Sequence, residues 1–173
     1  MPVEWIETIA SVVIGAFLGA ITTYLVQRRI YYEERRRALL DSLRAELEYN
    51  KRILEQGVAD YREFRYGYRG RTEVERIAIY YEPALSVFLR MITEGLLLYL
   101  REELRERTIE VYQELQDYLK RLELLKRADA VYDRRHESYD FQQEYERLRN
   151  NLDELREELI RKLDDLLRLI GRD

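Results

Sequence analysis

The sequence predicts an all-α protein in which an N-terminal transmembrane helix continues into a long antiparallel helical bundle with coiled-coil-like seams. Two features of the sequence predict this class. One is an uncharged run of nineteen residues near the N-terminus, and the other is Leu recurring at heptad-like intervals through the rest of the chain. The composition is the third observation, because the 173 residues include 37% charged residues but only 7 Gly and 2 Pro. So much charge with so few turn residues argues against a β-sandwich, a β-barrel or a Gly-rich nucleotide-binding fold.

Residues 1–27 are expected to form a membrane anchor. The run Thr8–Val26 would be about 28 Å long as a helix, close to the roughly 30 Å hydrocarbon core of a bilayer. Trp5 and Tyr24 lie near its ends, where amphipathic rings favour the headgroup region. A cleaved signal peptide would need basic residues before the run, whereas the charges there are acidic. We therefore expect a retained anchor, with a buried helix of a soluble protein as the alternative.

Basic residues follow the expected anchor and none precedes it. An excess of Arg on one flank places that flank in the cytoplasm, so we expect a single-pass protein of the cell membrane with its N-terminus outside and residues 28–173 inside. The same residues would attract anionic headgroups by on the order of 1 kcal/mol each, although topology alone explains them. They are Arg28, Arg29, Arg35, Arg36 and Arg37.

Four small residues recur at intervals of four within the anchor and share one helical face: Ser11, Gly15, Gly19 and Thr23. Small residues let two helix backbones approach closely in lipid. This face therefore predicts helix association, with a second copy or another membrane protein as the partner. The alternative is that Gly is simply common in membrane helices.

No Gly or Pro lies between Gly19 and Gly57, so the helix is expected to continue through about residues 28–63. Its seam consists of Leu40, Leu43, Leu47, Asn50, Leu54 and Tyr61. A polar residue such as Asn50 in a seam can fix register or oligomeric state. The alternative is a rim position that faces water.

Gln56–Thr72 is expected to be a loop, because Gly and aromatic residues break the helical pattern there. Its Arg residues, interleaved with aromatic ones, are Arg62, Arg65, Arg69 and Arg71. Such a pattern could stack on bases and contact phosphates, but no nucleic-acid-binding fold signature accompanies it, so we favour a connecting loop. Thr72 and Glu75 then form a capping box that predicts a short helix over 73–81.

Two long helices are expected in the remainder of the chain, over 83–127 and 140–170. The first begins with an apolar stretch, but Arg90 and Glu94 in its middle argue against a second membrane span. That stretch is therefore expected to be a buried or interfacial helix. The second carries the strongest periodic signal, from Tyr145 to Ile170. Facing seams on three long amphipathic helices predict an antiparallel bundle.

The layout resembles uncharacterised prokaryotic single-pass membrane proteins with a helical cytosolic domain. The resemblance lies in the N-terminal span, the Arg-rich flank, LLDSLRAELEYNKRIL and FLRMITEGLLLYLREELRERTIEVYQEL. It implies the fold and the membrane location, and no activity or catalytic residue. The small share of Lys among the basic residues also favours a thermophilic source, which GC-rich coding would equally produce.

The sequence offers little material for catalysis. It has no Cys and one His, and it lacks the phosphate-binding, dinucleotide-binding and nucleophile-elbow motifs. The spacing of Asp133 and His136 suits a metal, but one His cannot supply a carboxylate-bundle site, so a solvated turn is favoured. We therefore expect no enzyme, no cofactor and no small-molecule substrate.

The expected function is a membrane-tethered helical scaffold or adaptor. It would associate with itself through the Gly15/Gly19 face and the Leu40–Leu54 seam, or present its bundle to a protein partner. A membrane tether for nucleic acid through residues 61–71 and an accessory subunit of a membrane signalling or transport complex are the alternatives.

Overall fold

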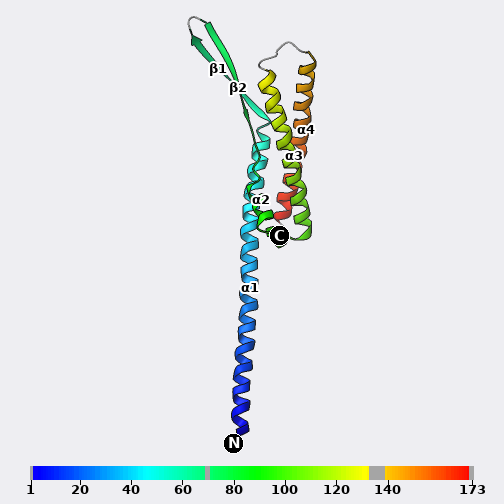
Figure 1. Ribbon diagram of the computed structural model, residues 1–173. Coiled ribbons are helices and arrows are strands. Elements are labelled where there is room, and N and C mark those ends of the chain that lie inside the picture. The colour runs from blue at the N-terminus through cyan, green and yellow to red at the C-terminus, as the bar shows by residue number, and fades with distance from the viewer. Residues whose placement is uncertain (1, 69–70, 133–138, 172–173) are drawn as a thin grey trace. The chain divides into compact units, whose positions relative to one another are not determined.

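The computed structural model describes the backbone of residues 2–68, 71–132 and 139–171, and the side chains of residues 13–60, 78–130 and 143–171. Helices form most of this described part, together with one two-stranded sheet (Figure 1). The chain divides into two compact units, Met1–Asp41 and Ser42–Asp173, called here the N-terminal unit and the bundle unit. The predicted helical class is confirmed, with the exception of the two strands.

The N-terminal unit is a single helix, the first part of α1 (Pro2–Glu55). Among the described residues, no helix combines the length and the apolar character needed to cross a membrane. The anchor expected over residues 1–27 is therefore not supported by this structure. The side chains of its first twelve residues lie outside the described part.

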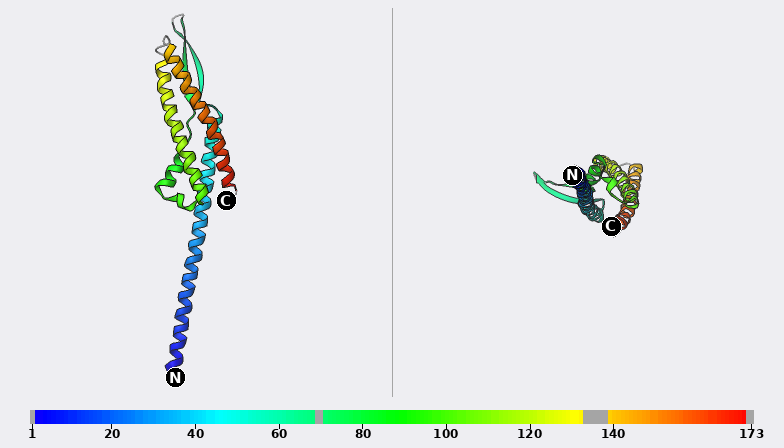
Figure 2. Two further views of the ribbon diagram at one scale, coloured as in Figure 1. Left: turned by 90° about the vertical axis from the view of Figure 1, so that its right-hand side faces the viewer. Right: turned by 90° about the horizontal axis from the view of Figure 1, so that it is seen from below.

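The bundle unit is built from the last part of α1, α3 (Glu102–Tyr132) and α4 (Tyr139–Ile170). α3 and α4 lie side by side and run in opposite directions in both views (Figures 1 and 2). α4 also runs antiparallel to α1, because Lys51 pairs with Asp164 at 2.7 Å while Arg156 Nη1 donates to the Leu54 carbonyl at 3.0 Å. The predicted antiparallel helical bundle is thus present within one chain.

The core of the bundle unit is formed by the predicted Leu seams. Most seam residues are buried. In α1, the fully buried seam residues include the polar Asn50. The α1 seam predicted for self-association is therefore covered by the chain's own helices. The buried hydrophobic seam residues of the three helices are Leu43, Leu47, Leu54, Leu104, Val111, Leu115, Tyr118, Leu122, Leu125, Leu152, Leu159, Leu163, Leu166 and Ile170.

A β-hairpin replaces the predicted loop and short helix. β1 (Ala59–Tyr68) pairs antiparallel with β2 (Arg71–Tyr80), in a register that runs from Ala59 opposite Tyr80 to Tyr68 opposite Arg71. The predicted helix over 73–81 is wrong, and the helix predicted to reach residue 63 ends at Glu55. β1 contains three Tyr and one Phe, and β2 contains Thr, Val, Ile and Tyr. These residue types favour strands, and pairing between the two segments outweighs the local capping box.

The helix predicted over 83–127 is divided in the structure. α2 (Ser86–Thr93) ends before Gly95, whose φ of 66° is the left-handed conformation that terminates helices. The short 3-10 helix η1 (Leu96–Tyr99) and an extended Leu100 then lead into α3. The helix predicted over 140–170 is confirmed, because α4 spans Tyr139–Ile170.

Candidate functional site

The described part of α1 in the N-terminal unit presents large apolar side chains to its surroundings. Each is between 40% and 66% exposed, and no charged residue interrupts them before Arg28. A helix that exposes apolar side chains so continuously needs lipid or another protein around it. These residues are Val13, Ile14, Phe17, Leu18, Ile21, Tyr24, Leu25 and Val26.

The predicted association face lies opposite the bulkiest of these side chains. At about 100° per residue, Val13, Phe17 and Ile21 lie on one side of the helix, and Gly15 and Gly19 lie on the other. A Cβ atom added at either glycine would meet nothing within 4 Å. Ser11 lies outside the described side chains. The backbone of this face is therefore open to a second helix.

Thr22 and Thr23, in the described part of the apolar segment, satisfy their hydroxyl groups within the helix. Thr22 Oγ1 donates to the Leu18 carbonyl and Thr23 Oγ1 to the Gly19 carbonyl, both at 2.8 Å. A hydroxyl bonded in this way needs no water, so it can be placed in an apolar environment at low cost. Thr23 therefore contributes no unsatisfied hydroxyl to the association face.

The predicted topology arginines all lie on α1, directly after the apolar segment. The Arg28 guanidinium lies 5.7 Å from the ring centre of Tyr32, and that of Arg35 lies 4.8 Å from the ring centre of Tyr31. Arg29 pairs with Glu33 at 3.2 Å. Arg36 is half-buried, and Arg37 is exposed. The five arginines therefore differ in their surroundings, which their sequence positions alone do not indicate.

A buried carboxylate in the bundle unit organises α2. Glu46 is 6% exposed; its Oε2 accepts hydrogen bonds from Ser86 Oγ at 2.6 Å and from the Val87 amide at 2.7 Å. Its Oε1 accepts one from the Tyr112 hydroxyl at 2.7 Å. The carboxylate thus binds the first turn of α2, where exposed amide groups and the helix dipole favour a negative charge. The Tyr112 ring also stacks on Phe88, with 4.4 Å between ring centres.

The pKa of Tyr112 lies well above its usual value. Burial of the side chain is the main cause, and the hydrogen bond to Glu46 is the second. Tyr112 is therefore a neutral donor to the carboxylate and holds α3 to α1. Neither Tyr112 nor Glu46 was singled out by the sequence patterns. Glu46 lies three residues after Leu43 and four before Asn50, so a charged residue on the seam face was the signal that could have identified it.

Asn50 lies one turn after Glu46 and is fully buried. Its Nδ2 donates to the Ala84 carbonyl at 2.8 Å, and its Oδ1 accepts from the Ala84 amide at 2.6 Å. The two-way bond fixes the segment before α2 against α1. The rim position facing water is excluded, and the role that the structure gives Asn50 is a contact within the chain.

The arginines of the predicted loop are placed by the hairpin backbone. Arg62 and Arg65 lie on β1, opposite Ile77 and Val74, and Arg71 begins β2 opposite Tyr68. Arg69 lies outside the described residues, as do the side chains of the other three.

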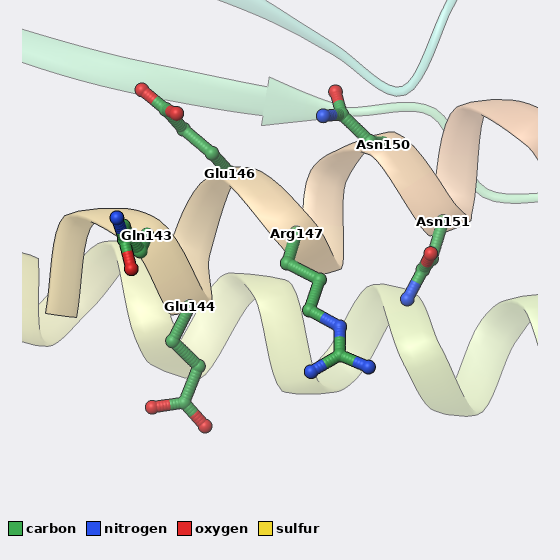
Figure 3. Close-up of a pocket in the computed structure, with 6 residues that line it drawn as sticks. All are labelled: Gln143, Glu144, Glu146, Arg147, Asn150 and Asn151. Atoms are coloured by element: carbon green, nitrogen blue, oxygen red, sulfur yellow. The ribbon is translucent and has the colours of Figure 1, made fainter. Parts of the chain in front are cut away.

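The surface hollows of the bundle unit do not bring reactive groups together. One is lined only by α4, and Figure 3 shows Glu146 and Asn150 pointing to one side of the helix while Glu144 and Arg147 point to the other. These side chains therefore diverge. The described residues that line this hollow are Gln143, Glu144, Glu146, Arg147, Asn150 and Asn151.

A second hollow of about 450 Å³ lies between α3 and α4. Its charged groups neutralise one another, since Lys162 lies 3.1 Å from Glu158 and also pairs with Glu110 and Glu114. The Arg107 side chain, at 3.0 Å, holds the pKa of Glu110 below its usual value. This arrangement is an ion-paired contact between two helices.

Among the residues that the structure describes, no three His, Asp or Glu side chains are grouped to hold a metal ion, and His136 lies outside that part of the chain. No protein-family model matches the sequence, and no curated protein or solved structure is detectably similar to it.

Proposed function

We propose that this protein is a single-pass, membrane-anchored helical scaffold, with residues 8–26 in the bilayer and the bundle unit in the cytoplasm. One observation carries the proposal: the apolar side chains between Val13 and Val26 are exposed, with no charged residue among them. The uncharged run extends back to Thr8 in the sequence, which gives a helix of about 28 Å. A bilayer is the environment that covers such a helix on every side.

Lipid accounts for this surface better than burial in a soluble partner. The hydroxyl groups of Thr22 and Thr23 are satisfied within the helix, as lipid requires. Gln27, Arg28 and Arg29 directly follow the segment, and Tyr24 lies close to its end. Aromatic and basic residues are typically found in this order at a cytoplasmic membrane surface. The Arg excess on this side supports the proposed cytoplasmic location of the bundle unit.

The proposed scaffold associates with a second copy through the small-residue face of the anchor. Packing of small residues is a main source of helix association in lipid, where no hydrophobic force acts between helices. Gly15 and Gly19 leave that face open. The Leu40–Leu54 seam, in contrast, is used inside the bundle unit, so the proposal assigns self-association to the anchor alone.

A structural role also fits the bundle unit. Its helices meet through Leu side chains, a buried two-way hydrogen bond at Asn50 and the Glu46 carboxylate, which together fix one arrangement of the helices. The described hollows are lined by diverging or ion-paired side chains. Such a unit suits display to a protein partner better than substrate binding.

Extraction of membranes from expressing cells with alkaline carbonate tests the anchor. The full chain is expected to stay in the pellet, whereas Phe17→Arg/Leu18→Arg is expected to move to the supernatant, because each charge at the bilayer centre costs about 2.5–3.5 kcal/mol. Leu89→Arg/Ile92→Arg is the matched control, since it makes the same change at two exposed apolar residues of α2 and is expected to stay in the pellet. Release of the unaltered chain would refute the anchor.

A further inference from the structure

A cluster of tyrosine and arginine side chains lies on one face of α1, at the end of the apolar segment and directly after it. We call Tyr24, Arg28, Tyr31, Tyr32 and Arg35 the Arg–Tyr band. At about 100° per residue, these five positions fall within an arc of roughly 100° around the helix. All three rings are exposed, with fractions of 61%, 51% and 44% along the chain. The band is therefore a continuous surface of the N-terminal unit.

The stacking holds two positive charges on one short section of helix. The Arg28 guanidinium lies 5.7 Å from the Tyr32 ring centre, and the Arg35 guanidinium lies 4.8 Å from the Tyr31 ring centre. The two rings belong to neighbouring residues, so both cations are held beside residues 31 and 32. That level is about 8 Å beyond Val26 along the helix, which is the depth of the headgroup layer if the apolar segment lies in the hydrocarbon core.

The acidic residues of this flank lie away from the band. Glu33 falls on the opposite side of the helix, where it pairs with Arg29 at 3.2 Å, and Glu34 falls about 60° outside the arc of the band. Arg29 is therefore partly neutralised by Glu33, and the Arg28 and Arg35 guanidinium groups lie beside aromatic rings. A guanidinium carries five N–H donors. Arg28 uses its side chain in a hydrogen bond with Tyr32, and a guanidinium held beside a ring in this way keeps further N–H groups that can bind a phosphate.

We propose that the Arg–Tyr band binds the phosphate groups of anionic lipids in the cytoplasmic leaflet. The proposal rests on the proposed membrane anchor and adds a lipid class to it. The positive-inside rule requires only that basic residues lie on this flank, on any face of the helix. The band adds a different expectation, that selectivity depends on the two stacked arginines more than on the total charge of the flank.

The test uses the full chain reconstituted in phosphatidylcholine vesicles, with spin-labelled phosphatidylglycerol and phosphatidylcholine as probes. Electron paramagnetic resonance measures the relative binding constant of the two lipids at the protein surface. The unaltered chain is expected to prefer phosphatidylglycerol several-fold at low salt, and less at high salt. Arg28→Gln/Arg35→Gln is expected to lose up to about fivefold of this preference per arginine.

Arg29→Gln/Arg37→Gln is the matched control, because it removes the same charge from the same flank outside the band. It is expected to keep most of the preference, and Tyr31→Leu/Tyr32→Leu, which keeps every charge, is expected to lose much of it. Equal losses in the two arginine variants, or no preference in the inserted unaltered chain, would overturn the band while leaving the anchor intact. Failure of the chain to insert in vesicles would overturn both proposals.

Discussion

Two buried tyrosines on α3 differ in what their hydroxyl groups meet. The Tyr112 hydroxyl donates to Glu46 at 2.7 Å and so connects α3 to the carboxylate that holds α2. The Tyr118 hydroxyl is also buried, and it has no hydrogen-bond partner within the described part of the chain. The Tyr112 hydroxyl therefore stabilises the bundle unit. The Tyr118 hydroxyl is buried without a hydrogen bond that would offset the loss of its contacts with water.

Replacing each of these tyrosines by Phe is expected to have opposite effects. Tyr112→Phe should lower the free energy of unfolding by about 1–3 kcal/mol, because it removes a donor from a buried carboxylate. Tyr118→Phe should leave that free energy unchanged or raise it, because it removes only a buried group without a partner. Urea unfolding of the full chain in detergent micelles, followed by circular dichroism, measures both. Equal losses in the two variants would contradict these roles.

Tyr118 and Lys162 are expected to make the stability of the protein depend on pH in the alkaline range. Burial raises the pKa of Tyr118 to about 12, and the hydrogen bond to Glu114 contributes most to raising the pKa of Lys162 to about 12. Between about pH 10 and 12 the unfolded chain loses these protons while the folded chain keeps them. The contribution of these two groups to the free energy of unfolding is therefore constant below about pH 10 and falls above it, by about 1.4 kcal/mol per pH unit for each proton.

Urea titrations of the full chain at several pH values above 9 measure this slope. Tyr118→Phe removes one titrating group, so its slope between pH 10 and 12 should be smaller by about one proton. Identical slopes in the two proteins would show that Tyr118 ionises equally well in the folded state.

At the level of residues, the sequence predicted most of the buried positions and few of the polar contacts. Heptad spacing identified Leu43, Leu47 and Leu54 and placed Asn50 among them, because helical periodicity is a local property. The partner of Asn50 is the backbone of Ala84, and the carboxylate of Glu46 binds residues 86 and 87. These contacts join segments about forty residues apart, and no spacing rule connects them.

Among the elements, α4 was predicted almost residue by residue, whereas the hairpin was missed. The α4 pattern repeats over about seven turns, so a strong local signal and the tertiary structure agree. The hairpin depends on pairing between Ala59–Tyr68 and Arg71–Tyr80. The second of these segments alone carries a weaker strand signal than the capping box of Thr72 and Glu75 within it. The break at Gly95 was missed because a single Gly within a helical pattern is often tolerated.

The anchor part of α1 supplies a prediction about association. Gly15→Leu/Gly19→Leu should weaken dimerisation in micelles by about tenfold or more, because the larger side chains keep the two backbones apart. The open space around both glycines means that the altered helix itself is not strained. Sedimentation equilibrium of the full chain in density-matched detergent measures the dissociation constant.

Val13→Leu/Phe17→Leu is the control for this experiment, since it places the same residue type on the bulky face of the same helix. Its dissociation constant should match that of the unaltered chain. A monomeric unaltered chain, or equal weakening in both variants, would rule out the small-residue face as the contact.

For the whole molecule, the account depends on which side of a membrane each end of the chain occupies. The proposed anchor, the Arg–Tyr band and the display of the bundle unit all require an outward N-terminus and a cytoplasmic C-terminus. The chain contains no Cys, so a single introduced cysteine reports its own location without interference.

Labelling of Glu4→Cys and Asp173→Cys with a membrane-impermeant maleimide, in intact cells that express the full chain, tests this claim most directly. With the proposed topology, the cysteine at position 4 is expected to react in intact cells, while the cysteine at position 173 is expected to react only after lysis. Protection of both cysteines until lysis, or reaction of position 173 from outside, would contradict it.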